Sequence, residues 1–364
     1  MKKEAKILFL LLRVAISNRS EIPSLNVDWE NVFELALRQG VRGIAFEGLE
    51  TIKKETTDNL SFPSRDILLK WYAQSVLVEK KYCQQKKLSE EFAAILKKYG
   101  IKTIVFKGLA HSRFFPNPAH REFGDFDCYL IDSNGKAAYN KGNEVAKLIG
   151  CTVDDSWYKH SKIGFNGLTI ENHKYITPAR RGGTDKLLND YLINAIGNAN
   201  SLDANDDTDV YILPNEAEGL FMLYHSLMHF LVEGITLRHF VDWACWIKAN
   251  QDKLQWCDFY AQCKRFRLDG FVDVMNTIAV KYLGVIVNDK ILVVDSPYAD
   301  RTIESALYDD YQIKNRGKGR WHERYGVIKN AFRFSWKYKD VAHYSTVGYL
   351  WQFVYGFLRR GEED

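Results

Sequence analysis

The strongest constraint on the fold is an abrupt change of pattern at Gly100. Between Arg65 and Tyr99 the chain has neither Gly nor Pro, and apolar clusters alternate with charged ones, as in one long helix or two consecutive helices. The next six residues, 101–106, are rich in β-branched side chains and are bounded by glycines, which predicts a strand. The chain must therefore combine helical regions with a sheet.

Further along the chain, short apolar runs predict two more strands, at residues 126–131 and 168–175. A helical segment is expected at 109–115, and helical patterns return after Pro214, at 216–233 and 237–249. We therefore predict an α+β fold in which a small mixed sheet is flanked by N- and C-terminal helical regions. The expected domains are 1–100, 101–212 and 213–364.

The composition limits the class of protein. A chain of 364 residues with 46% hydrophobic and 26% charged residues is globular and long enough for more than one domain. The net charge of +4 is small, but residues 314–339 hold nine basic residues against one acid, Glu323. This segment is either a solvated helix face or a docking surface for a phosphate-bearing partner; nucleic acid is not favoured as that partner.

The cysteines and the N-terminus indicate the compartment. None of the six cysteines forms a CxxC pair, which argues against a zinc knuckle or a disulfide scaffold. The basic start and the apolar run 7–12 resemble a signal peptide, but Arg13 interrupts the run, so we expect a first amphipathic helix and a cytoplasmic protein. A targeting segment remains the alternative. No run reaches the roughly 18 apolar residues of a transmembrane helix.

The sequence Gly124-Asp125-Phe126-Asp127 carries the first chemical signal. Side chains alternate along a strand, so Asp125 and Asp127 point to the same side. Two neighbouring carboxylates repel each other unless a cation compensates them. A pair of Mg²⁺ ions is a common solution where phosphoryl oxygens are held during an in-line displacement.

A second signal lies at Phe106-Lys107-Gly108, between a strand and a helix. The glycine lets the backbone approach a triphosphate, and Lys107 and Arg121 are expected to neutralise a leaving pyrophosphate. Two plainer interpretations stay open. Lys107 can be a solvated lysine at the end of a strand, and Arg121 can form a structural salt bridge with Glu122 or Asp125.

Together these motifs resemble those of a known family. Phe-Lys-Gly-Leu-Ala at 106–110, followed by Pro-x-Pro-x-x-Arg-x-x-Gly-Asp-x-Asp at 116–127, is similar to a bacterial family of uncharacterised nucleotidyltransferases within the polymerase-β-like superfamily. Its later Glu-x-His strand is matched by Glu171-Asn172-His173. Its downstream helices are matched by His225, His229, Arg238 and Asp242-Trp243. One departure is Leu109, which stands where the superfamily has Gly or Ser.

The resemblance implies a Mg²⁺-dependent enzyme that moves an NMP from an NTP such as ATP to a hydroxyl of an unidentified acceptor. Asp125, Asp127 and Glu171 would be catalytic and hold two Mg²⁺ ions, and Glu171 would take the acceptor's proton; Asp154 and Asp155 compete for that third place. The nucleotide would contact Lys107, Gly108, Arg121 and Gly124. The remaining candidates would support the metal ligands or line an acceptor pocket: His173, His225, His229, Arg238 and Asp242.

Two other functions remain open at this point. Leu109 favours a catalytically silent nucleotide-binding or interaction module of the same fold. The basic segment favours a binder of anionic partners. His225 and His229 also lie four apart on a predicted helix, a spacing that lets two imidazoles share a metal, although core packing explains the same pattern.

Overall fold

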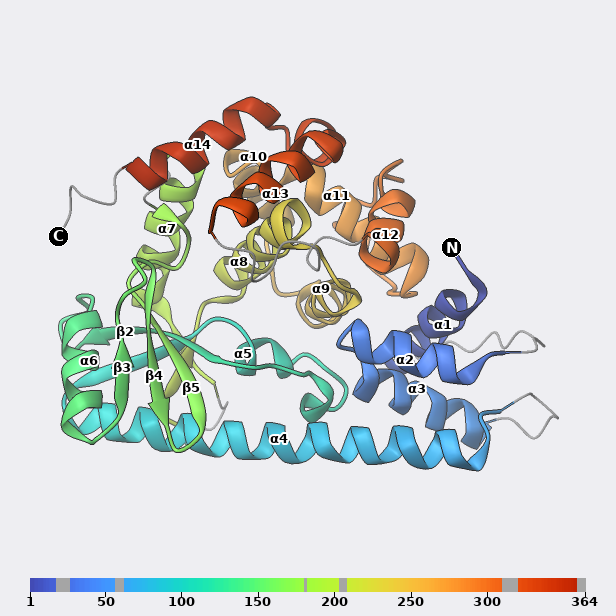
Figure 1. Ribbon diagram of the computed structural model, residues 1–364, viewed down its shortest axis with the longest axis horizontal. Coiled ribbons are helices and arrows are strands. Elements are labelled where there is room, and N and C mark those ends of the chain that lie inside the picture. The colour runs from blue at the N-terminus through green and yellow to red at the C-terminus, as the bar shows by residue number, and fades with distance from the viewer. Residues whose placement is uncertain (18–26, 56–61, 180–181, 203–207, 310–319, 359–364) are drawn as a thin grey trace. The chain divides into compact units, whose positions relative to one another are not determined.

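The computed structural model describes residues 1–17, 27–55, 62–179, 182–202, 208–309 and 320–358 (Figure 1). Residues 314–319 of the predicted basic segment lie outside this range. The chain divides into two compact units. We call residues 81–113, 123–222 and 351–364 the sheet unit, and residues 1–80, 114–122 and 223–350 the helical unit. Each is described by itself.

The sheet unit is built on one sheet of seven strands in the order β3-β4-β5-β2-β1-β7-β6. Strands β1 and β7, and strands β2 and β5, pair in parallel, whereas the other neighbours are antiparallel. The predicted α+β class with a mixed sheet and helical flanks is thus confirmed. The strands are β1 (Ile101–Val105), β2 (Phe126–Asp132), β3 (Thr152–Asp154), β4 (His160–Phe165), β5 (Leu168–His173), β6 (Asn200–Ser201) and β7 (Val210–Ile212).

The hairpin between β4 and β5 sets the register on which the site depends. Its turn is Asn166-Gly167, whose φ angles of 49° and 85° are those of the two-residue turns that match the twist of paired strands. Counting back from this turn, His160 pairs with His173 and Lys162 pairs with Glu171. A two-residue turn determines the register of the two strands, so the local sequence fixes these pairings.

One face of the sheet packs on helices to form the core of this unit. Apolar side chains of β1, β2, β4 and β5 join Phe92, Ala93 and Leu96 from the later part of α4 (Arg65–Lys98), which is one continuous helix. Helix α6 (Tyr139–Leu148) lies along the strands, as Figure 1 shows. The opposite face of β2 and β5 carries the polar side chains of Asp127, Glu171 and His173, beside the buried side chains of Tyr129 and Ile131. We call it the polar face.

Helix α5 is shorter than expected. It spans only Leu109–Ser112, whereas the sequence suggested a helix over 109–115. Pro116 disfavours helical geometry in the residue before it, which helps to end the helix early. A short 3₁₀ turn, η1 (Pro118–His120), follows before β2. The sheet unit also contains α7 (Gly183–Ala195) and η3 (Ile196–Asn198).

The helical unit contains the predicted first helix, α1, which packs its apolar side chains against α3. A Cβ atom at Gly48 of α3 would lie 2.0 Å from the carbonyl oxygen of Leu11, so glycine is needed for this close approach. The helices of this unit are α1 (Lys3–Ser17), α2 (Trp29–Arg38), α3 (Arg42–Glu55), α9 (Leu237–Asn250), α10 (Trp256–Arg265), α11 (Asp269–Thr277), α12 (Ala299–Tyr308), α13 (Arg320–Arg333) and the π-helices η4 (His229–Glu233), η5 (Ile278–Tyr282) and η6 (Lys337–Val341).

Three helices, α4, α8 (Asn215–Met228) and α14 (Thr346–Leu358), contribute residues to both units. The helix predicted over 216–233 is observed as α8 followed by the π-helix η4. Within the described part of the chain, no helix combines the length and the apolar character needed to cross a membrane.

Candidate active site

The polar face of the sheet unit carries a row of ionisable residues in register. Asp127 at the start of β2 pairs with Glu171 on β5, and Glu171 pairs with Lys162 on β4. Paired residues on neighbouring strands point to the same face, and Asp125 lies on that face because it precedes Asp127 by two residues. The sheet thereby brings the carboxylates of Asp125, Asp127 and Glu171 together, although Asp125 and Glu171 are 46 residues apart in the sequence.

Asp127 is the most deeply held of the three. Its carboxylate forms an ion pair with the Lys107 ammonium, which comes from the end of β1. The same oxygen, Oδ1, accepts a hydrogen bond of 3.0 Å from Nε2 of His173. Burial opposes ionisation of Asp127, but Lys107 and His173 outweigh it and hold the pKa of this carboxyl far below its ordinary value. Asp127 is therefore an anion at neutral pH.

Glu171 lies between two imidazoles. Its Oε2 is 3.5 Å from Nε2 of His173 and 3.6 Å from Nε2 of His160. Burial again favours the neutral acid, but the hydrogen bond from His173 lowers the pKa of Glu171 below its ordinary value. Burial lowers the pKa of His160 to about 4, so this ring is neutral at pH 7.

Asp125 differs from its neighbours because it is exposed and has no cationic contact of its own among the described ion pairs. Partial burial first, and then repulsion by Glu171 and Asp127, raise the pKa of Asp125. Repulsion of this kind is relieved by a cation. The ligand atoms of Asp127, Glu171 and His173 lie within 4.8 Å of one another, a group that does not include Asp125.

The turn after β1 is shaped by Gly108. Its φ of 51° is unfavourable for residues with a side chain, and an added Cβ would lie 3.1 Å from the ring of Phe123. Leu109 belongs to the apolar core, so its side chain does not reach the polar face. A Cβ at Gly124 would meet nothing within 4 Å, and its carbonyl accepts a hydrogen bond of 2.7 Å from Gln85.

Arg121 was predicted to contact phosphate, and this prediction needs correction. Its guanidinium is buried in the helical unit and donates from Nε and Nη2 to the two carboxylate oxygens of Asp242, at 3.0 and 2.8 Å. The plainer interpretation, a structural salt bridge, is the one observed, with Asp242 as the partner instead of Glu122 or Asp125. Asp242, which was named as a candidate for supporting the metal ligands or lining an acceptor pocket, uses both carboxylate oxygens in this ion pair. Arg238 donates to the carbonyl of Glu122 at 3.3 Å in the same region.

Other candidates fall in different surroundings. Asp154 belongs to β3, is exposed, and accepts a hydrogen bond from the backbone of Ser156. Asp155 is also exposed. His225 and His229 lie in the helical unit beside His239.

His160 and Lys162 are site residues that the sequence analysis missed. Their segment mixes polar and apolar residues and was not recognised as a strand. The signal that identifies them is the Asn166-Gly167 turn, because it requires a strand on each side of it. Alternation along β4 then places both side chains on the face that carries Glu171 and His173.

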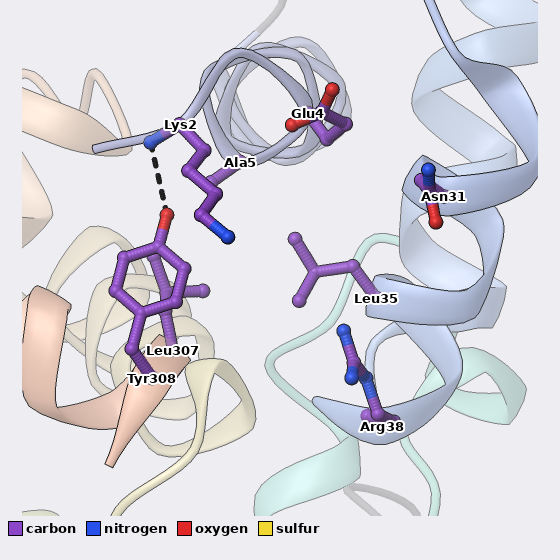
Figure 2. Close-up of a pocket in the computed structure, with 8 residues that line it drawn as sticks. All are labelled: Lys2, Glu4, Ala5, Asn31, Leu35, Arg38, Leu307 and Tyr308. Atoms are coloured by element: carbon purple, nitrogen blue, oxygen red, sulfur yellow. Dashed lines mark hydrogen bonds between the residues drawn. The ribbon is translucent and has the colours of Figure 1, made fainter.

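A separate pocket of about 670 Å³ opens in the helical unit (Figure 2). The backbone amide of Lys2 donates to the Tyr308 hydroxyl at 2.9 Å across one side of it. The pocket contains none of the motif residues, so we assign it no part in the chemistry. Its lining residues are Lys2, Glu4, Ala5, Asn31, Leu35, Arg38, Leu307 and Tyr308.

Comparison with known proteins identifies the family of the chain. A search of curated proteins and a search of solved structures gave no match. The profile of a family described as uncharacterised nucleotidyltransferase matches residues 26–284, which is well over half of the chain. The matched region includes the carboxylates, Lys107, the glycines and the histidines considered above. The chain therefore belongs to this family of uncharacterised nucleotidyltransferases.

Proposed function

We propose that this protein is a Mg²⁺-dependent enzyme that transfers an NMP from an NTP to a hydroxyl group and releases pyrophosphate. The observation that carries the proposal is the register of β2 and β5, which sets Asp127 opposite Glu171 with Asp125 two residues before. The family assignment supports nucleotidyl transfer in general terms.

The donor set suits magnesium. Mg²⁺ prefers carboxylate oxygens and retains several waters, so an exposed carboxylate beside a buried and a partly buried one is an appropriate site. Asp125, Asp127 and Glu171 would hold the Mg²⁺ ions. We expect two ions, by analogy with other enzymes that transfer phosphoryl groups with a pair of metals. Bound Mg²⁺ would supply positive charge for the phosphate oxygens.

The side chains of the chain itself have distinct tasks. Lys107, which pairs with Asp127 at the end of β1, would neutralise the triphosphate, and the turn at Gly108 would present backbone to it. His173 donates from Nε2 and fixes the orientation of the Asp127 carboxylate. Neutral His160 fills the space beside Glu171 without adding charge.

In the proposed reaction, the acceptor oxygen forms a bond to the α-phosphorus of the NTP while the bond from that phosphorus to the bridging oxygen breaks. Pyrophosphate leaves with the electron pair of that bond. The acceptor's proton passes to the ionised carboxylate of Glu171 and from there to water. Each atom and charge is accounted for without any further reactant.

The test is incubation of the purified protein with each of the four α-³²P-labelled NTPs and Mg²⁺, following pyrophosphate release and label transfer. Acceptors from several classes are added: protein, sugar, small alcohol, antibiotic and RNA. Asp125→Asn, Asp127→Asn and Glu171→Gln should each lower the rate by about 10²–10³-fold or more. Asp154→Asn is the matched control, because Asp154 is an exposed carboxylate on β3 of the same sheet, and it should retain full activity.

The outcomes discriminate between functions. Binding of NTP without pyrophosphate release for any acceptor class would overturn the enzyme proposal in favour of a silent nucleotide-binding module. Equal loss of activity in Asp154→Asn and Asp127→Asn would point to a general effect of charge and would also overturn the assignment of the site.

A further inference from the structure

Three histidines of the helical unit form a second cluster, separate from the carboxylates. Ligand nitrogens of His225, His229 and His239 all lie within 4.8 Å of one another. The ring centroid of His229 is 4.6 Å from that of His225 and 4.7 Å from that of His239. Neither the family assignment nor the nucleotidyl transfer chemistry accounts for this grouping.

The local fold explains how the three rings meet. His225 and His229 are four residues apart on one helical face. At His229 the α-helix changes into the π-helix η4, whose end is closed by a bond of 2.7 Å from the Gly234 amide to the His229 carbonyl. Gly234 has a φ of 92°, and the chain turns back there so that the first turn of α9 brings His239 to the pair. π-helical turns are frequent at functional sites.

The Nδ1 atoms of His229 and His239 contact polar groups of neighbouring residues. Nδ1 of His229 lies 3.2 Å from Oε2 of Glu233. Nδ1 of His239 accepts a hydrogen bond of 3.2 Å from the Thr236 backbone amide and lies 3.1 Å from the Thr236 hydroxyl. Metal-binding histidines commonly place their second ring nitrogen against a carboxylate or carbonyl, which fixes the ring and the tautomer. For His229, the contact with Glu233 sets the tautomer in which Nδ1 carries the proton and Nε2 carries the lone pair that a metal requires.

Charge around the cluster is compatible with a cation. The charge of Arg238 is offset by Asp242 and Glu122. The side chain of His229 is 25% exposed, which gives an ion a route from solvent.

We propose that His225, His229 and His239 bind one divalent transition-metal ion, with Zn²⁺ as the first choice, and that Glu233 orients His229 from behind. Three imidazole nitrogens suit Zn²⁺, whereas Mg²⁺ prefers oxygen ligands. Three protein ligands leave the fourth tetrahedral position to water or another exchangeable ligand. This site therefore differs from the proposed magnesium site in both its metal and its ligands.

The proposal is tested with the full-length protein stripped of metal by a chelator. Zn²⁺ is titrated in competition with a chromogenic chelator, and Co²⁺ serves as a spectroscopic probe because tetrahedral and octahedral Co²⁺ absorb differently. The wild-type protein should bind one equivalent of Zn²⁺ at this site, and thermal unfolding should shift to a higher temperature. His229→Gln should weaken this binding by at least 100-fold, and Glu233→Gln by about 10–100-fold.

Matched variants separate this site from others. His343→Gln removes a half-exposed histidine that contacts Asp269 in the same unit, and it should bind Zn²⁺ as the wild type does. The double variant Asp125→Asn, Glu171→Gln should also retain the ion, so failure of the nucleotidyl transfer proposal would leave this one standing. Absence of Zn²⁺ binding by the wild type, or binding that His229→Gln and His225→Gln leave unchanged, would overturn the proposal.

Discussion

Arg121 and Asp242 form a buried, two-point ion pair between residues that are far apart in the sequence. Their side chains are only 8% and 4% exposed, and two parallel hydrogen bonds join them. This geometry ties the segment before β2 to helix α9 within the helical unit. The pair matters for stability because removing either residue would leave the charge of the other buried without compensation.

Asp242→Ala should lower the free energy of unfolding by about 3–5 kcal/mol, because the Arg121 guanidinium would lose its partner in a dry site. The double variant Arg121→Met, Asp242→Leu should recover much of this loss, since it buries no charge. Urea unfolding measures both effects. Lys186→Ala, which breaks the exposed Lys186–Asp190 pair, is the control and should change stability by less than about 1 kcal/mol. A loss in Asp242→Ala no larger than in this control would show that the pair contributes little.

Lys107→Met tests the cation beside Asp127. We expect kcat/KM for the NTP to fall by about 10–100-fold, since a charge-assisted contact to phosphate contributes about 1.5–3 kcal/mol. The pKa of Asp127 should also rise, because Lys107 is one of the groups that hold it low. Steady-state kinetics and NMR titration of the carboxyl measure the two effects.

The control for this variant is Lys102→Met, on the same strand. Lys102 lies 3.7 Å from the ring centroid of Tyr211 and makes no ion pair with the site carboxylates. Equal kinetic losses in Lys102→Met and Lys107→Met would contradict the role given to Lys107.

His160 should make the protein less stable as the pH falls. Its folded pKa of about 4 lies below the ordinary value of 6.5, so the unfolded chain binds the proton more readily between these pH values. Stability is therefore expected to rise with pH from 4 to 6.5. Urea unfolding at several pH values should give a shallower rise in His160→Gln than in the wild type. An unchanged slope would mean that the ring takes up its proton without cost.

His120 should act in the opposite direction. Although burial opposes protonation, hydrogen bonds to Glu47 and Glu79, at 2.7 and 2.9 Å, raise the pKa of this ring above 6.5. The resulting stabilisation is fully present below pH 6.5 and is lost as the pH rises through the folded pKa. In the wild type, stability should therefore fall above pH 6.5, and His120→Gln should remove that part of the fall. Parallel curves for the two proteins would argue against a charged His120.

Gly108→Ala and Gly124→Ala form a matched pair. The first should destabilise the protein by about 1–3 kcal/mol, because φ is positive and the new Cβ meets the Phe123 ring at 3.1 Å. The second should leave stability nearly unchanged, since nothing lies within 4 Å of the added atom. If Gly124 borders the nucleotide, its variant should raise KM at constant stability. Thermal unfolding and kinetics distinguish these results, and similar melting temperatures for both variants would contradict the argument.

The sequence was sufficient to predict the parts of the fold that are locally determined. Strands β1, β2 and β5 are rich in apolar or β-branched residues and were placed within two residues of their observed ends. Strands β3, β6 and β7 have three residues or fewer, too short for a periodic pattern to emerge. Strand β4 was missed because polar residues interrupt its apolar face.

In the candidate site, too, some features follow from the local sequence and others only from the tertiary fold. Alternation along one strand predicted that Asp125 and Asp127 share a face, and the resemblance to the family supplied Glu171. The partner of Arg121 lies on helix α9, 121 residues further along the chain, and follows only from the tertiary fold. His239 likewise joins His225 and His229 only because a π-helical turn and Gly234 reverse the chain.

The interleaving of the two units along the chain determines the order in which they can form during synthesis. Residues 81–222 supply the core of the sheet unit, including Phe92 and Leu96, which a fragment covering only the predicted domain 101–212 would lack. Helix α1, in contrast, is made first, yet Arg13 bonds to the carbonyl of Tyr282. On the ribosome, the sheet unit should therefore assemble its core while the first helices still await partners that emerge some 270 residues later.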